Sequence, residues 1–516
     1  MATREEIAFL REARSGKGAA QLILGRYYLF GGAGLKRNGT SALYWLHRAA
    51  TRNEREAWLS IGRHIPFEVA AGAPDPGRFC IWYERAVDAG VVEAALTWAR
   101  LLLATGEEVL PRKALTALEQ AARAGQIEAQ WLLAQELNRP LAAQAGRQAQ
   151  GPVAQAAPGK AVDPAALEWA TRAAANGVLQ AQRALADRAE HMGEVADFLR
   201  WGLPVARALV RRQAMPPGVM AADDAAFLAR CASHWQRAGD ADPHELERFW
   251  QLAAGAGNRE ARFALGLWFA NMDEQGQRRA GHARNSNYRK AIHFLTLAGE
   301  QGEGAAWYAL SRIFMRPNTG LSAHGLADAR RYLEHAAQAG HRTAQLELGR
   351  VCWRNRRSDP DNDVRAAHWL AKAAAQGAAE AAELLARIAT DAAPAPWAHE
   401  ASLRMTADAA ATYPLLAARI ELAARFGLSL PEAMLLDVNA ADRGHCLLVD
   451  IRALHARSKR RLILVRTGGE RLALGRIGQK FAGIDCRPGG PEGNYRQRLY
   501  LFRKLFGEPG ARGKGD

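Results

Sequence analysis

The sequence predicts a mainly α fold, an α/α superhelical solenoid of helix pairs followed by a small C-terminal α+β domain. A turn residue recurs through most of the chain, with an alanine four residues after it and a small residue nine after it. An aromatic residue stands eight residues before most of these turns. Several intervals between turns, such as 302 to 340 to 377, have the length of helix-pair repeats. Beyond about residue 405 this period is absent.

Each turn residue is expected to end a helix. The turn residues are Gly16, Asn53, Gly90, Gly125, Gly177, Gly257, Gly302, Gly340 and Gly377. The position after a helix often needs positive φ, which glycine adopts freely and asparagine tolerates. The alanines that follow are Ala20, Ala57, Ala94, Ala129, Ala181, Ala261, Ala306, Ala344 and Ala381. Their small side chains indicate close packing of one helix on the next.

The aromatic residues before the turns are expected to fill the space between successive hairpins. They are Trp45, Trp82, Trp169, Phe249, Phe294, Tyr332 and Trp369, and Ala117 takes this position before Gly125. A side chain two turns back on the second helix of a pair buries on the order of 150 to 250 Å² when it is enclosed. The sequence therefore predicts one aromatic wedge in each unit.

These residues resemble the Sel1-like repeat family, a relative of the tetratricopeptide repeats. The resemblance rests on residues 19–28 and 42–50, and again on residues 344–349 and 366–377. It extends over about residues 16–389 and implies a right-handed superhelix of antiparallel helix pairs that holds other proteins. Two intervals depart from the pattern. We expect a flexible insertion at about 138–163, and a degenerate repeat at about 178–257 with a boundary at Gly218.

The domain organisation follows from these changes in composition. We expect a repeat solenoid over 1–391, a stiff Ala/Pro linker over 392–404 and a basic α+β domain over 405–516. Apolar and β-branched runs in the last domain predict two strands, and cap and turn signals predict helices. The expected helices are 413–426, 431–436, 467–481 and 491–506, and the expected strands are 446–451 and 462–465.

Positive charge is concentrated at the C-terminus. The chain has a formal net charge of +16, and residues 401–516 hold 20 basic against 11 acidic residues. Such a surface suits nucleic-acid phosphates, and interleaved tyrosines suit stacked bases. The alternative is that these cations protect an edge strand and solvate a helix whose apolar side faces the core. The candidate nucleic-acid contacts are Arg457, Lys459, Arg460, Arg461, Arg496, Arg498, Arg503 and Lys504.

Catalytic and metal sites are weakly indicated. Acids and histidines between Asp437 and His455, followed by Lys459, loosely resemble the arrangement of metal-dependent nucleases, but the compact acid-x-lysine unit is missing. Asp437 and Asp442 are better interpreted as capping or turn residues. Zinc would need closely spaced ligand pairs, which His445, Cys446, His455 and Cys486 do not provide. We therefore assign no catalytic residue, no cofactor and no metal ligand.

The sequence thus predicts a cytoplasmic, non-enzymatic scaffold or adaptor that binds protein partners on the concave face of its repeats. No apolar run predicts a membrane span or a signal peptide. The five cysteines have no close pairs, which is typical of free thiols in a reducing compartment. The alternative function is nucleic-acid binding or processing by the basic C-terminal domain, with nuclease activity as its enzymatic form.

Overall fold

The computed structural model describes residues 10–32, 34–107, 109–139, 163–213, 220–279, 286–316 and 325–507. The chain divides into two compact units, Met1–Ala256 and Gly257–Asp516. The predicted boundary at Gly218 and nearly all of the predicted insertion at 138–163 lie outside the described residues. The end of the solenoid at 391 and the start of a separate basic domain at 405 remain predictions, whereas the linker between them is corrected below.

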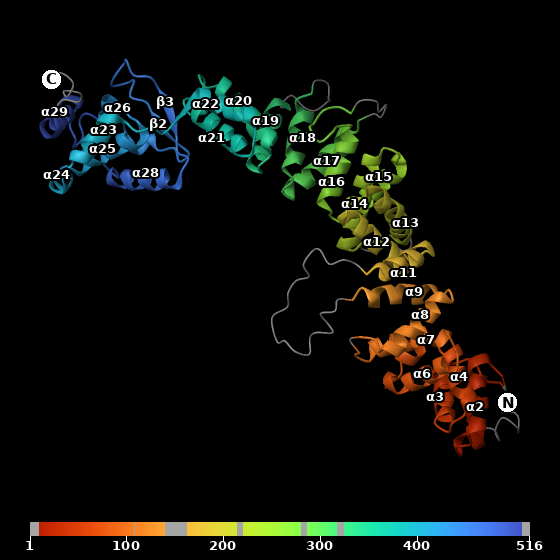
Figure 1. Cartoon of the computed structure of the whole chain (residues 1–516). Helices are drawn as coiled ribbons and strands as arrows, with labels where there is room; N and C mark the ends of the chain where they lie inside the picture. Colours follow the sequence, from red (N-terminus) through yellow and green to blue (C-terminus); the bar gives the residue numbers. More distant parts are fainter. Residues whose placement is uncertain are drawn as a thin grey trace. The chain divides into compact units, whose positions relative to one another are not determined.

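The first unit consists of helices arranged as consecutive antiparallel pairs (Figure 1). Its helices are α2 (Gly18–Phe30), α3 (Gly39–Ala50), α4 (Arg55–His64), α5 (Phe67–Ala71), the 3₁₀ helix η1 (Pro76–Phe79), α6 (Cys80–Asp88), α7 (Glu93–Ala104), α8 (Arg112–Arg123), α9 (Ile127–Leu137), α11 (Pro164–Ala175), α12 (Leu179–His191), α13 (Val195–Gln213), α14 (Ala222–Ala238) and α15 (Pro243–Gly255). The repeats continue in the second unit as α16 (Arg259–Ala270), α17 (Tyr288–Glu300), α18 (Gly304–Phe314), α19 (Gly325–Gln338), α20 (Arg342–Arg354), α21 (Asn362–Ala375) and α22 (Ala379–Ile388).

The predicted turn and alanine framework is confirmed in both units. Every predicted turn residue has positive φ, from 64° at Asn53 to 97° at Gly16. All nine alanines that follow the turns are buried. In several repeats the next residue is a buried glutamine whose side-chain amide donates to a carbonyl eight residues earlier, as Gln345 does to Ala337 at 3.0 Å. This bond fastens the start of a first helix to the end of the helix before it, and the sequence pattern did not predict it.

The predicted place of the aromatic residues, in the space between successive hairpins, is wrong for most repeats. Most of the aromatics pack inside their own hairpin, where Tyr332 of α19 stacks on Trp307 of α18 with ring centres 5.7 Å apart. Tyr332 and Trp369 are only half-buried. In these two repeats the residue that follows the aromatic lies deeper, since Leu333 and Leu370 are almost fully buried. The reason is that neighbouring positions point about 100° apart on a helix, and the leucine position faces the first helix of the pair.

The small residue nine positions after the turn receives this leucine. A Cβ atom built on Gly349 of α20 would lie 2.7 Å from Cγ of Leu370 on α21. The same relation joins Gly25 to Leu46 and Gly266 to Leu295. The missing side chain of the first helix therefore sets how closely the two helices of a hairpin approach.

The last repeat helix leads directly into a small sheet. The strands are β1 (Ala389–Asp391), β2 (Cys446–Val449) and β3 (Arg461–Leu464), in the order β1-β3-β2. β1 runs parallel to β3, with Thr390 opposite Ile463, and β2 runs antiparallel to β3. Side chains of β2 and β3 join one buried cluster with residues of α21 and α22, including Leu370 and Leu385. The sheet thus packs on α21 and α22 at the place where the second helix of a hairpin that begins with α22 would be expected.

The remaining elements surround the second core of this module. They are α23 (Pro396–Arg404), α24 (Ala407–Thr412), α25 (Pro414–Phe426), α26 (Leu430–Leu435), α27 (Val438–Ala441), α28 (Gly468–Lys480) and α29 (Tyr495–Phe506). The predicted helices and both strands are confirmed within a few residues, and Thr467 forms the predicted capping box. The expected linker is wrong over 396–404, since these residues form α23, whose buried alanines pack on α25.

Candidate functional site

The eight predicted nucleic-acid contacts do not gather on one exposed face. Arg460, Arg461 and Arg498 bind internal partners instead of projecting into solvent. Arg457 and Lys459 are exposed on the loop between β2 and β3, and Arg496, Arg503 and Lys504 are exposed on α29. The predicted surface is therefore divided into two exposed residues on the loop, three exposed residues on α29, and three arginines that are bound to other parts of the protein. Nucleic-acid binding by the exposed residues remains a prediction.

Arg460 joins the last repeat to the C-terminal module. Its Nε donates to Asp363 of α21 at 2.7 Å, and its Nη1 donates to Asp450 at 3.1 Å. Asp450 also accepts two bonds from the guanidinium of Arg452, at 2.9 and 2.8 Å. The bonds from Arg452, together with those from Arg460, hold the pKa of the Asp450 carboxyl far below its usual range. This carboxylate is therefore saturated with arginine donors.

Two further arginines hold the core of the module together. Arg498 is buried on α29 and donates to the carbonyl oxygens of Gly493, Met434 and Cys486. Burial is the main cause that lowers the pKa of Arg498, and the positive charge of Arg419 lowers it further. Arg419 is completely buried and forms a two-pronged pair with Glu492 at 2.7 and 2.6 Å. Fully bonded buried charges of this kind fix the fold, because removal of one partner leaves an uncompensated charge.

The acidic cluster considered for a nuclease is dispersed. Asp437 caps α27 by accepting from Ala440, whereas Asp442 pairs with Arg471 and accepts from the backbone N–H of Gly444. The hydrogen bond from Arg471 lowers the pKa of the Asp442 carboxyl. The capping and turn roles expected for Asp437 and Asp442 are confirmed. Within the described ranges, no three His, Cys, Asp or Glu side chains come together in a group able to hold a metal ion.

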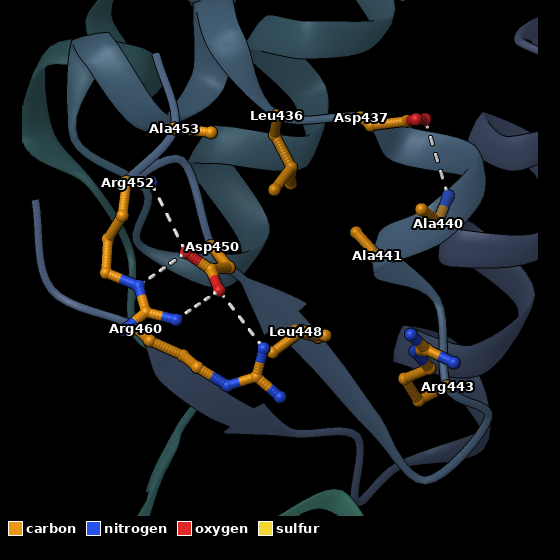
Figure 2. A pocket seen from close by; sticks show the side chains of 10 residues that line it. All are labelled: Leu436, Asp437, Ala440, Ala441, Arg443, Leu448, Asp450, Arg452, Ala453 and Arg460. Atoms are coloured by element: carbon orange, nitrogen blue, oxygen red, sulfur yellow. Dashed lines mark hydrogen bonds and ion pairs between the residues drawn. The ribbon is translucent and has the colours of Figure 1, made fainter. Parts of the chain in front are cut away.

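A cleft of about 590 Å³ opens beside the arginine and aspartate network (Figure 2). Arg443 lies on one side of it, and Arg452 and Arg460 lie on the other. Small and apolar side chains separate them. The residues that line the cleft are Leu436, Asp437, Ala440, Ala441, Arg443, Leu448, Asp450, Arg452, Ala453 and Arg460. Of the residues that line the cleft, Arg460 was a predicted nucleic-acid contact and Asp437 a predicted cap or turn residue, whereas Arg443 and Arg452 lie in two different loops and belonged to no predicted motif.

A second surface feature lies on the repeats of the first unit. We call it the aromatic–arginine patch and define it by Tyr44, Trp45, Arg48, Ile81 and Arg85 on α3 and α6. Tyr44 and Ile81 are 50% and 45% exposed, and each stands one residue before a repeat aromatic. The guanidinium of Arg48 lies 5.4 Å from the ring centre of Trp45. Trp82 of α6 donates to His47 of α3 at 2.8 Å, so the two helices are neighbours.

The fold places the chain among helix-pair repeat proteins. Sel1 repeats match residues 18–54, 158–178, 260–303 and 343–377. These four segments fall inside the span of the resemblance noted from the sequence. Proteins built from such repeats generally serve as protein-interaction scaffolds. No curated protein matches the chain.

Two solved structures are similar to this chain at low sequence identity. One is a protective antigen present in uropathogenic Escherichia coli strains that displays an SLR fold, with 18% identity, coverage of 99% of both chains and a TM-score of 0.41. The other is a Sel1 repeat protein from Oxalobacter formigenes, with 20% identity, coverage of 75% of this chain and 90% of that chain, and a TM-score of 0.25. In the parts of the chain that the structure describes, none of the helices has the length and apolar character needed to span a membrane.

Proposed function

We propose that this chain is a non-enzymatic scaffold or adaptor that holds a protein partner on the concave face of its repeats. The presence of Sel1 repeats supports the general class. The repeat framework supports it physically, because alanines, leucines and glutamines are buried in a fixed pattern while other surface positions vary from unit to unit. A framework of this kind keeps the fold constant and leaves the surface available for recognition.

The observation that carries the proposal is the aromatic–arginine patch. Aromatic and arginine side chains are enriched at the energetic centres of protein interfaces. In this patch the arginines Arg48 and Arg85 are stacked on ring faces, so that less side-chain freedom is lost when a partner binds. Tyr44 and Ile81 add exposed apolar surface at equivalent positions of two neighbouring second helices.

A photo-cross-linking experiment tests the proposal on the full chain. A photoreactive phenylalanine is placed at Tyr44 or Ile81 on second helices, and separately at Ile127 or Leu179, which are exposed on first helices. We expect one discrete protein adduct in cells that make the chain. Tyr44→Glu should abolish an adduct formed at Ile81, whereas Thr40→Glu, at an exposed position of the same helix, should preserve it.

The outcomes test separately whether the chain holds a protein partner and whether that partner binds at the aromatic–arginine patch. Adducts only from Ile127 or Leu179 retain the scaffold and reject the aromatic–arginine patch. The absence of a discrete adduct from all four positions rejects the scaffold itself.

A cytoplasmic location is part of the same proposal. All five cysteines are free thiols, and four of them are buried. Burial raises the pKa of Cys231 and of Cys446 to about 12, so both remain protonated and unreactive at neutral pH. Free thiols are typical of reducing compartments. Cell fractionation that finds the chain in an oxidising compartment would reject this part.

A further inference from the structure

We propose that the aromatic–arginine patch binds an acidic segment of its protein partner, in which carboxylate side chains stand beside apolar ones. The inference rests on the proposed scaffold function and adds the chemistry of the partner to it. Repeats of this chain carry the same ring-stacked arginine with and without an internal carboxylate, and the two repeats of the patch are among those without.

The repeat that contains α11 shows the complete arrangement. Its repeat aromatic is Trp169, and the guanidinium of Arg172 lies 4.7 Å from the ring centre. Glu168, one residue before the tryptophan, accepts from Nη2 of Arg172 at 2.6 Å. The acid and the arginine are four residues apart and therefore share one face of the helix. The charge of this stacked arginine is thus offset within its own helix.

The two repeats of the patch keep the arginine and lack the acid. Arg48 and Arg85 stand three residues after their repeat aromatics, as Arg172 does. One residue before the aromatic, where α11 has its glutamate, α3 and α6 have Tyr44 and Ile81. Among the described residues, neither arginine of the patch forms an ion pair with a carboxylate. In both repeats an exposed aromatic or aliphatic side chain thus replaces the internal acid.

The acids of the same helices are bound by another cation. α3 has no acidic residue, and the two acids of α6 are Glu84 and Asp88. Nζ of Lys113 on α8 lies 2.9 Å from a carboxylate oxygen of each. These acids are therefore engaged toward α8, and the carboxylate that the stacked arginines lack has to come from outside the helix pair.

Arg85 shows what such a partner can bind. Its guanidinium lies 5.2 Å from the ring centre of Trp82 and 5.5 Å from that of Trp58. Ring contacts restrict the side chain without satisfying its N–H donors, and a carboxylate can accept two of these in parallel. Ile81, four residues earlier on the same helix face, is 45% exposed and offers apolar contact to a neighbouring side chain of the same segment. A phosphate backbone has no apolar group for Ile81.

The experiment measures the fluorescence anisotropy of a short labelled peptide of Asp, Leu and Gly titrated with the full chain at low ionic strength. Two matched peptides replace every Asp by Asn, or every Leu by Gly. We expect saturable binding of the first peptide. The Asn peptide should bind about ten-fold more weakly or less, because charge-assisted hydrogen bonds are lost, and the peptide without leucine should bind a few-fold more weakly.

Variants of the chain separate a specific site from general electrostatic attraction. Ile81→Glu supplies the carboxylate that α11 has and should weaken binding of the Asp peptide about ten-fold, whereas Ile81→Gln should weaken it only a few-fold. Leu179→Glu adds the same charge at an equally exposed apolar position of α12 and should leave binding unchanged. Arg85→Gln should also weaken binding about ten-fold, and the exchanges at the exposed Ile81 test the site even if this variant fails to fold.

Three results overturn the inference. They are equal binding of the Asn peptide, equal weakening by Leu179→Glu and Ile81→Glu, and tighter binding of a single-stranded DNA of the same charge, which would indicate a nucleic-acid surface. The scaffold function fails separately. A discrete cross-linked partner at Tyr44 or Ile81, together with no binding of the Asp peptide, rejects the acidic segment and retains the scaffold, whereas the absence of every adduct rejects both.

Discussion

The contact between Gly349 and Leu370 gives a sharp test of how each hairpin is packed. A Cβ at Gly349 would lie 2.7 Å from Cγ and 2.9 Å from Cδ2 of Leu370, and 3.4 Å from its backbone nitrogen. Leu370 is almost fully buried, so it cannot move out into solvent. Gly349→Ala therefore forces the two helices apart, and overpacking of this kind costs about 1 to 3 kcal/mol.

The helix propensity of alanine works in the opposite direction. Replacing glycine by alanine inside a helix stabilises by up to about 1 kcal/mol. The closeness of a branched carbon and of backbone places the overpacking cost near the upper end of its range, so we expect a net loss of about 1 to 2 kcal/mol. Gly475 of α28 is the matched control, because a Cβ there would meet nothing within 4 Å. Gly475→Ala should stabilise the C-terminal module by about 0.5 to 1 kcal/mol.

The assay is native-state hydrogen exchange, because a repeat array does not unfold in one step and local opening energies are needed. Amides of residues 342–375 should lose protection in Gly349→Ala, whereas those of α28 should not. In the double variant with Leu370→Ala the two effects should not add, with a coupling of about 0.5 to 3 kcal/mol. If Gly349→Ala stabilises its hairpin as Gly475→Ala stabilises α28, the glycine does not set the helix spacing and the reasoning is wrong.

Three other predictions address the turns, the acid pair and the basic loop. Gly340 has a φ of 90°, so Gly340→Val should lower the free energy of unfolding of its repeat by a few kcal/mol, whereas Gly340→Asn should lower it much less. Equal thermal melting of the two variants contradicts the helix-ending role. The pKa of Asp450 is lowered in the folded state, so its contribution to stability is complete above the unfolded pKa near 4 and is lost as the pH falls below that value. Asp450→Asn should therefore make the unfolding of the C-terminal module less sensitive to acid between about pH 5 and pH 2, and an unchanged sensitivity rejects this role. Nucleic-acid binding through the exposed loop predicts an affinity that falls steeply with salt, and changing both Arg457 and Lys459 to Ala should reduce the logarithmic salt slope by about one unit per lost contact; no binding of the full chain to DNA or RNA at low salt rejects it.

The repeat framework was predictable because it depends on local chemistry. Positive φ at a helix end restricts the residue to glycine or asparagine, and the nine positions follow this rule. The small residue at Gly349 was also visible as a pattern. Its partner was not, because Trp369 and Leu370 are adjacent and both apolar, and only the arrangement of the two helices shows which one faces the glycine.

The candidate site was less predictable because charge counts treat all arginines alike. Arg460 reaches Asp363, which lies 97 residues earlier in the chain. Arg498 sits on a helix whose sequence is amphipathic, but its guanidinium turns inward to bind carbonyl oxygens of three separate segments. Arg443 and Arg452 stood in loops without a motif. Contacts between distant segments decided in each case whether a cation is structural or available.

The parallel pairing of β1 with β3 determines where the array can change its length. β1 begins directly after the last repeat helix, and the strands it joins bury their side chains against α21 and α22. A further hairpin inserted after Ile388 would separate α22 from the sheet and expose the apolar residues of both. Duplication or deletion of repeats is therefore compatible with this fold only upstream of α21, and a shortened chain that stops at residue 391 would carry an unpaired strand into solution.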